Sequence, residues 1–445
     1  MDYYSVVMGI DVTGISVNIF GVILALALSI FLIIKKMNPA LAMFTGVFAG
    51  ALVGGADLFQ MMDVVILGGR QIVGINIRII AGGFLAGVLV ETGAAETIAR
   101  VIVKGLGEKK AIPAIVLSAM IVTASGVFIT VALVMVAPIA LSVAYKANVS
   151  KFAAVLAISG GGKAGNIMSP NPNTIAAAGA FDAPLSEVMI SGFIPGMAAL
   201  AVTILLCSLV RNKHFKVEAG DLDASVDAAN LPSFGKAITA PAVAIGLLML
   251  NPIGDVFGIS FINSANLPMD PFYTLPIGAV VGLVVMGKAR KTADFAAKGV
   301  LRMTPIVLML FGAGAIGGLI TVSVFPAMIE NSLYNMGIPT AFLAPLSSTI
   351  FSCATGSTSA GVIIGGEAFA PTILAAGVPA VAGAVMLHAG GGFIDIVPHS
   401  NMFLATQQGM KCTMVERIKV MPYEAAVGGV MTLTAVVMYL AGFWG

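Results

Sequence analysis

The chain has 445 residues, of which 58% are hydrophobic and only 10% are charged, and its mean hydropathy is +1.02. Soluble globular proteins carry roughly 25% charged residues, so this composition excludes a soluble domain and predicts an integral membrane protein. The formal net charge is +2 without a basic stripe or an aromatic binding motif, which excludes nucleic-acid binding.

The first group of apolar runs covers 17–92, with predicted helical spans at 17–34, 39–55 and 64–92. Each run approaches or exceeds the ~20 residues that a helix needs to cross a bilayer. No Lys or Arg precedes the first run, so it is interpreted as a retained span and not as a cleaved signal.

The next apolar segment, 111–145, is too long for one crossing and is flanked by Lys110 and Lys146. A hairpin that turns at Ala124-Ser125-Gly126 would return both lysines to one side, so a re-entrant hairpin is predicted. A broken helix follows over 152–181, interrupted between Gly160 and Asn173, and a span at 188–210 ends this half of the chain.

A polar linker at 211–236 separates this half from a second set of segments with the same order. The second set comprises predicted scaffold spans within 237–324, a hairpin and a broken helix within 341–408, and a span at 423–443. The second hairpin is predicted to turn at 354–359, and the second helix break lies between Gly390 and Asn401.

Three pairs of glycines indicate an ancient duplication, because Gly82 and Gly312, Gly126 and Gly356, and Gly160 and Gly390 are each separated by 230 residues. We therefore predict repeat one at 1–210, with scaffold spans over 17–92 and a hairpin and broken helix over 111–181, and repeat two at 237–445. Clusters of Lys and Arg mark the cytoplasmic side and place the two repeats in opposite orientations. The predicted fold is an all-α polytopic membrane protein of two inverted-topology repeats, with re-entrant hairpins, broken helices and both termini outside.

Polar side chains collect at the four helix breaks, where backbone groups at membrane depth must be buried in protein or line a wet cavity. Half-helix N-termini in such breaks attract anions, so a small organic anion is the predicted ligand. Lys163 would pair with its carboxylate or would bind free carbonyl groups. The other candidate substrate-binding residues are Ser125, Gly126, Asn166, Ser169, Asn171, Asn173, Thr174, Thr355, Gly356, Ser357, Thr358, Ser400 and Asn401.

Titratable residues near the second break are the candidates for proton coupling, namely His388, Asp395 and His399. The alternative is that some of them, His388 above all, only fix the unwound loop by hydrogen bonds. Glu367 is expected to hydrogen-bond across to the broken helix. The three cysteines lack metal-ligand spacing and no nucleotide-binding or hydrolase motif is complete, so no metal, no cofactor and no enzyme activity are predicted.

The chain resembles the gluconate permease (GntP) family of the ion transporter superfamily on the residues Ser169-Pro170-Asn171-Pro172 after the first break and Ala354-Thr355-Gly356-Ser357 in the second half. The family motif of the first break, a His-Gly followed by Pro-Pro-His-Pro, is matched in part, with Ser169 at the first proline and Asn171 at the histidine. Phe128, Thr130 and Pro138 fall in the related stretch of the first hairpin.

This resemblance implies proton-coupled uptake of gluconate or another hydroxy monocarboxylate across a bacterial inner membrane. It also implies a homodimer in which a scaffold carries a mobile part, about 111–210 and 341–422, through an elevator-like step. Alternatives are a sodium-coupled carboxylate transporter, an ion exchanger or channel without an organic substrate, and a hydrolase that uses Ser400 beside His399.

Overall fold

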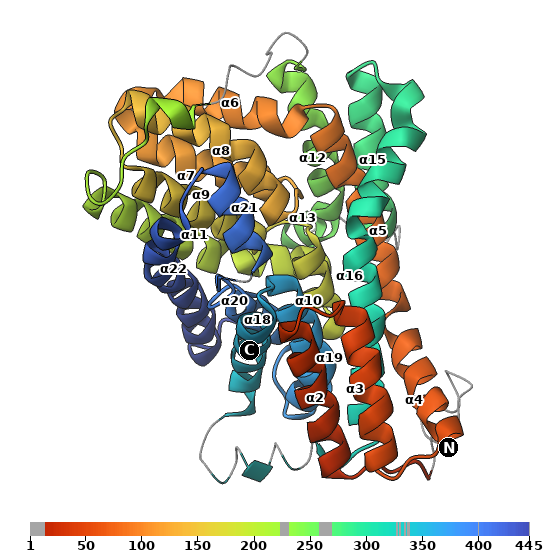
Figure 1. Ribbon diagram of the computed structural model, residues 1–445. Coiled ribbons are helices and arrows are strands. Elements are labelled where there is room, and N and C mark those ends of the chain that lie inside the picture. The colour runs from red at the N-terminus through yellow and green to blue at the C-terminus, as the bar shows by residue number, and fades with distance from the viewer. Residues whose placement is uncertain are drawn as a thin grey trace.

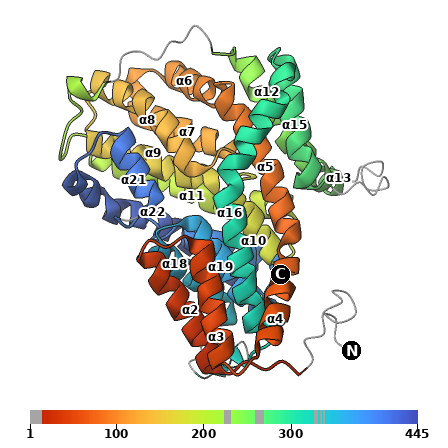
Figure 2. The same ribbon diagram turned by 45° about the vertical axis from the view of Figure 1, so that its right-hand side comes forward.

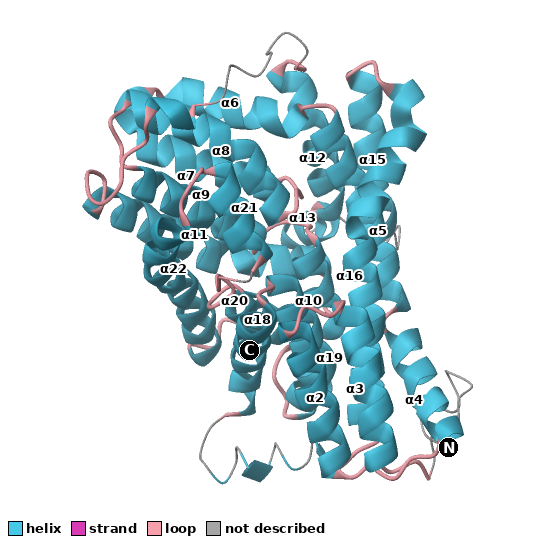
Figure 3. Ribbon diagram, in the orientation of Figure 1, coloured by secondary structure: helices cyan, strands magenta, loops and turns pink. Residues whose placement is uncertain are grey.

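The computed structural model describes residues 14–222, 231–257, 269–325, 328, 331–332, 335, 339–398 and 400–444. Part of the predicted linker, at 223–230, and the candidate coupling residue His399 lie outside the described residues. The described residues form helices joined by loops (Figure 3), which confirms the all-α class.

The first half of the chain forms a group of membrane helices followed by a hairpin, a broken helix and a long final helix. Its helices are α2 (Ile19–Ile34), α3 (Pro39–Val53), α4 (Leu58–Gln71), α5 (Val73–Glu91), α6 (Ala94–Leu106), α7 (Ala111–Ala124), α8 (Ile129–Lys146), α9 (Lys151–Asn166), α10 (Pro172–Ala180) and α11 (Leu185–Leu209).

The second half repeats this order. Its helices are α12 (Phe234–Leu248), α13 (Leu250–Phe257), α15 (Pro271–Val285), α16 (Thr292–Thr321), α18 (Leu343–Thr355), α19 (Thr358–Ala375), α20 (Ala380–Gly391), α21 (Asn401–Gly409) and α22 (Met414–Leu440). Single 3-10 turns lie at Glu108–Lys110, Ala219–Asp221, Ala289–Lys291 and Thr340–Phe342.

The two halves have opposite directions in the molecule. Hairpin α7–α8 lies in the upper part of Figure 1 and hairpin α18–α19 in the lower part, and Figure 2 shows the same arrangement from a second side. The helix pairs α2–α3 and α12–α15 are likewise at opposite ends, while α16 runs along most of the height beside α5. The architecture of two inverted repeats is therefore confirmed.

Local sequence explains where the breaks fall. Gly126 and Gly356 have φ angles of 98° and 65° in the two hairpin turns, a region that glycine adopts at little cost. In the first broken helix, Pro170 disfavours helical backbone at the preceding residue, and Asn171 then caps the restarted helix with Pro172 in its first turn. Ser400 caps the restarted helix of the second break.

The first break is shorter than predicted, because Gly160–Gly162 belong to the continuous helix α9. These glycines permit close helix packing instead of unwinding. A Cβ added at Gly161 would lie 2.2 Å from the carbonyl oxygen of Val116 on α7, and one at Gly160 would meet Thr203 of α11. The predicted span at 64–92 also differs, since it consists of α4 and α5, which meet at Ile72.

Six helices in the described part of the chain are long and apolar enough to cross a membrane, among them α5, α8, α11, α19 and α22. The start of α9, the polar linker and the turn after α21 meet at one place. Lys151 pairs with Asp221 at 2.8 Å and donates to the carbonyl of Lys411. Arg417 of α22, in contrast, lies inside the protein. It is fully buried and donates two hydrogen bonds to Glu424, at 2.6 and 2.9 Å.

Candidate functional site

The four helix breaks converge on one small pocket. The tip of the second hairpin, the start of α8 after the first hairpin turn, the restarted helix α10 and the second break all contribute to its wall. Its lining residues are Phe128, Ile129, Thr130, Asn173, Gly356, Ser357, Thr358, Ser359, Asp395, Asn401 and Met402, and its volume is about 30 Å³. Each repeat supplies part of this wall, so neither repeat forms the pocket alone.

A buried ion pair lies at this pocket and joins the two repeats. The amine of Lys163 on α9 is 2.6 Å from Oδ1 of Asp395 in the second break, and their side chains are 2% and 1% exposed. Lys163 also donates to the carbonyl of Gly392, and Thr358 at the start of α19 donates to the other carboxylate oxygen at 2.6 Å. Each charge therefore has its opposite charge and at least one further hydrogen bond, as buried charges require.

The second cross-repeat contact involves Asn173 of α10. Its side-chain oxygen accepts a 2.6 Å hydrogen bond from Ser359 of α19, and its amide nitrogen is buried without a partner in the described structure. Because Asn173 also lines the pocket, this nitrogen is a free donor at the place where a ligand would lie. Asn166 has a comparable free acceptor in its side-chain oxygen.

His388 on α20 is buried and bridges the first broken helix. Its Nε2 is 3.1 Å from the amide nitrogen of Asn166, and its Nδ1 is 3.4 Å from the hydroxyl of Thr174. Since the Asn166 amide donates and the Thr174 hydroxyl already donates to a carbonyl, a neutral ring with its proton on Nδ1 fits both contacts. The arrangement fixes α20 to the first break.

Several predicted site residues form hydrogen bonds with backbone groups at or near the helix breaks. Asn171 caps α10 and donates to the carbonyl of Asn166, and Ser169 donates to the same carbonyl at 3.2 Å. Ser357 caps α19 beside the pocket. Ser125 and Thr355 donate to carbonyls in their own helices.

The sequence interpretation omitted three pocket residues, Ile129, Met402 and Ser359, from the candidate site, and it singled out Phe128 and Thr130 only through the family resemblance. All five lie within a few residues of a hairpin turn or a helix restart. That position in the chain is the signal by which they can be found.

The expected hydrogen bond from Glu367 to the broken helix is absent among the described contacts. Glu367 instead faces Gly317 of α16, where an added Cβ would lie 3.4 Å from the carboxylate oxygen Oε2. Thr358 of α19 lines the pocket and is nine residues, about two and a half helical turns, before Glu367, so the two side chains lie on opposite sides of α19.

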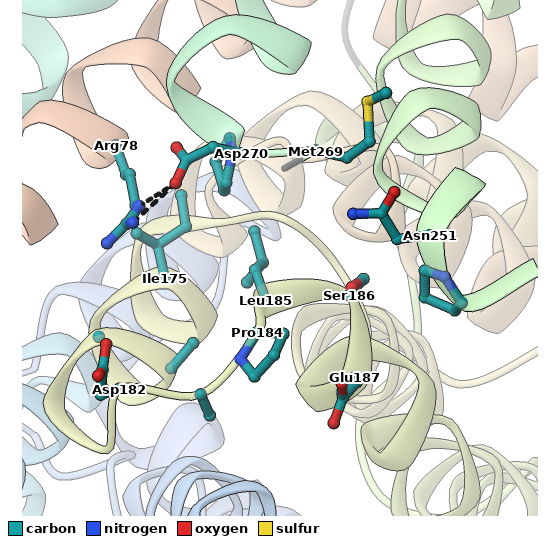
Figure 4. Close-up of a pocket in the computed structure, with 15 residues that line it drawn as sticks. Arg78, Ile175, Asp182, Pro184, Leu185, Ser186, Glu187, Asn251, Met269 and Asp270 are labelled. Carbon is teal, nitrogen blue, oxygen red and sulfur yellow. Dashed lines mark hydrogen bonds and ion pairs between the residues drawn. The ribbon is translucent and has the colours of Figure 1, made fainter. Parts of the chain in front are cut away.

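A larger cavity of about 650 Å³ lies apart from the four breaks, between α5, α15 and the turn that joins α10 to α11. Figure 4 shows Arg78 paired with Asp270 on one wall, at 2.7 Å. Asp270 also caps α15. Arg78 thus has a structural partner. No group of three or more metal-binding side chains occurs in the part of the chain that the structure describes.

Comparisons with known proteins agree with this architecture. The sequence profile of the family described as GntP family permease matches residues 17–441. An uncharacterized transporter of Haemophilus influenzae is 42% identical over 424 residues, covering 95% of this chain and 98% of that protein. A high-affinity gluconate transporter of Escherichia coli is 25% identical over 320 residues, covering 67% of this chain and 69% of that protein.

A gluconate permease of Pseudomonas aeruginosa is 23% identical over 358 residues, with 76% of this chain and 78% of that protein covered. Among solved structures, the YdaH transporter of Alcanivorax borkumensis superposes with a TM-score of 0.58 at 16% identity, over 87% of this chain and 89% of that chain. This likeness concerns the fold alone. The profile match over nearly the whole chain places the protein in the GntP permease family, and it is a membrane transporter.

Proposed function

We propose that the protein is a proton-coupled symporter of a small organic acid, such as gluconate or another hydroxy monocarboxylate. The observation that carries this proposal is the ion pair between Lys163 and Asp395, buried where four helix breaks meet. Family membership and the names of the gluconate-transporting relatives support the substrate class.

The ion pair suggests how a proton and an anion bind together. In the closed site the charge of Lys163 is neutralised by Asp395. Protonation of Asp395 removes the negative charge and leaves the amine free to bind a substrate carboxylate. The site then holds one positive and one negative charge before and after loading, so no uncompensated charge is buried at either stage.

Polar groups around the pair suit a hydroxylated acid. The unpartnered amide nitrogen of Asn173 is a donor for a substrate oxygen, and the hydroxyls of Thr130 and Ser357 line the same pocket. We assign the coupling proton to Asp395, because both ring nitrogens of His388 have neutral partners. His388 then serves to hold the first break in place.

A conformational step must precede loading. The pocket has about 30 Å³, room for roughly one water molecule, so a sugar acid fits only after the hairpin tip at Gly356–Ser359 moves. We propose that residues 111–210 and 341–422 move against the remaining helices by an elevator-like step, within a homodimer in the bacterial inner membrane. The hairpins would be re-entrant, and both termini would face outward.

The test is uptake of labelled acids by purified protein in liposomes under separate proton and sodium gradients. We expect saturable uptake of gluconate or a related acid driven by the proton gradient alone. Asp395→Asn should abolish accumulation but retain exchange of substrate, because Lys163 then has no titratable partner. Uptake driven only by sodium would replace proton coupling by the sodium alternative, and no uptake of any acid would refute the proposed substrate class.

A further inference from the structure

The carboxyl group of Glu367 has no partner among the described residues and lies where the proposed moving part contacts the proposed fixed part. Glu367 is on α19, which the proposed function assigns to the moving part, and it packs on Gly317 of α16 in the scaffold. The atoms nearest to an added Cβ at Gly317 all belong to Glu367, at 3.2 to 3.4 Å. No hydrogen bond or ion pair of Glu367 occurs within the described residues, although ionisable groups in membrane helices are normally paired.

The residues next to Glu367 face other helices, so Glu367 is the residue of this stretch that faces α16. Gly365 packs against Ser347 and Ser348 of α18 and against Leu387 of α20, and Gly366 packs against Ala180 at the end of α10. Glu367 is the next residue and is turned to the scaffold. It is nine residues from Thr358, which is roughly 13 Å along a helix, so it does not belong to the substrate pocket.

Within the described residues, no cation compensates the carboxylate from the main elements packed on α19, which are α10, α16, α18, α20 and the uncharged 3-10 turn at Thr340–Phe342. On α16 the charged residues Asp294, Lys298 and Arg302 lie in its first half, and Gly317 is at least fifteen residues further on, roughly 22 Å along the helix. Helix α20 contributes His388, which faces the first break. Helices α10 and α18 carry no charged residue, and Asp395 touches α19 only at Thr358.

We propose that Glu367 is a second proton-binding residue, and that its protonation controls the contact between α19 and α16. The neutral acid can remain packed on the glycine surface of α16. Glu367 is half-buried there, so its carboxylate loses part of its hydration without gaining a partner, and ionisation favours separation of the two helices. Glu367 would thus act as a positioning residue that links proton binding to the movement of the hairpin. This inference rests on the proposed function for its division into moving and fixed parts.

The test measures the contact between α19 and the segment that directly follows α16, and it needs no substrate. In a background without the three native cysteines, Phe325→Cys and Phe369→Cys place thiols where two aromatic rings lie 5.9 Å apart, for cross-linking by a short bifunctional methanethiosulfonate. The cross-linking yield at each pH is divided by the rate at which the two single-cysteine variants react with the same reagent at that pH. This corrects for the pH dependence of thiol reactivity. With Glu367 intact, we expect cross-linking to fall about tenfold or more from pH 5 to pH 9.

The matched variant Glu367→Gln keeps the size of the side chain and removes its titration, so cross-linking should stay high at every pH. Glu367→Asp should retain the pH dependence, and His388→Gln tests the titratable residue of the neighbouring helix α20. Constant cross-linking with Glu367 intact, or an unchanged pH dependence in Glu367→Gln, would overturn the inference. Uptake assays on the same variants separate the two proposals, since a pH-dependent contact without transport of any acid would refute the function and leave the role of Glu367 intact.

Discussion

Lys163 shows how one residue combines the stability and the chemistry of this protein. It directly follows Gly160–Gly162 of α9, and its amine reaches Asp395 and the carbonyl of Gly392 in the other repeat. A charge that is 2% exposed is tolerated only with this compensation. The same pair that would bind substrate therefore also joins the two repeats.

Removing one member of the pair should be more damaging than removing both. We expect Lys163→Met to destabilise the protein by about 3–5 kcal/mol, because Asp395 would stay buried without its opposite charge. Adding Asp395→Leu to Lys163→Met should recover most of this loss. The measurement is the fraction of folded protein by size exclusion after heating in detergent. As a control, Glu96→Gln breaks the partly exposed pair with Arg100 and should cost less than about 1 kcal/mol. Equal losses in the single and double variants would contradict this account.

The cysteines provide a residue-scale test of burial. Burial raises the pKa of the Cys412 thiol, in the turn between α21 and α22, to about 12. Since the thiolate is the reactive form, Cys412 should react slowly with N-ethylmaleimide at pH 8 and faster only as the pH approaches 12. Cys353 is partly exposed near the second hairpin tip and should react first. Mass spectrometry after timed labelling checks this order, which equal rates in the folded protein would contradict.

At the scale of helices, glycine decides how closely α9 can pack. An added Cβ at Gly161 would lie 2.2 Å from the Val116 carbonyl, and at Gly390 in the other repeat it would lie 2.3 Å from the Pro345 carbonyl. The two broken helices thus contact their hairpins in equivalent ways. This packing holds each break against the hairpin whose turn lines the pocket.

Gly161→Ala should therefore destabilise the protein by about 1–3 kcal/mol, since backbone atoms must shift to admit the methyl group. Gly105 on the surface of α6 has no atom within 4 Å of an added Cβ. Gly105→Ala should be neutral or stabilising by up to about 1 kcal/mol, because alanine favours a helix. Heat denaturation of both variants under the same conditions is the measurement, and similar stability of the two would argue against close packing at Gly161.

At the scale of the whole molecule, movement requires that contacts between the two parts change. Ile75 of α5 and Gly179 of α10 lie on opposite sides of this proposed interface, and an added Cβ at Gly179 would be 3.4 Å from the Cβ of Ile75. This is close to the Cβ separation of a disulfide, about 3.8 Å. An oxidised pair at these positions would join the parts covalently.

We expect the double variant Ile75→Cys and Gly179→Cys, in a background without native cysteines, to stop transport on oxidation and to regain it on reduction. Substrate binding should persist in the oxidised protein. The control is Ala137→Cys with Gly409→Cys, which joins α8 and α21 inside the proposed moving part, where the Cβ separation is 3.1 Å. Full transport by the oxidised Ile75/Gly179 pair would exclude relative movement at this contact.

The sequence by itself determined the membrane class, the duplication, the hairpin turns and the family, because these depend on composition, helix length, glycine and proline chemistry, and chain order. The turns at Gly126 and Gly356 and the restarts at Asn171 and Ser400 are local features, set by residues within one or two turns of helix. The sequence also placed Lys163 and Asp395 in the candidate site.

Only the tertiary structure decided which side chains meet. The pairing of Lys163 with Asp395 joins residues from different repeats, and it depends on how the inverted halves interlock. The same holds for Arg417, which is buried against Glu424, and for Glu367, which faces α16 and not the broken helix. Long-range contacts of this kind depend on the relative rotation and depth of the helices, and no local pattern in the chain encodes those two quantities.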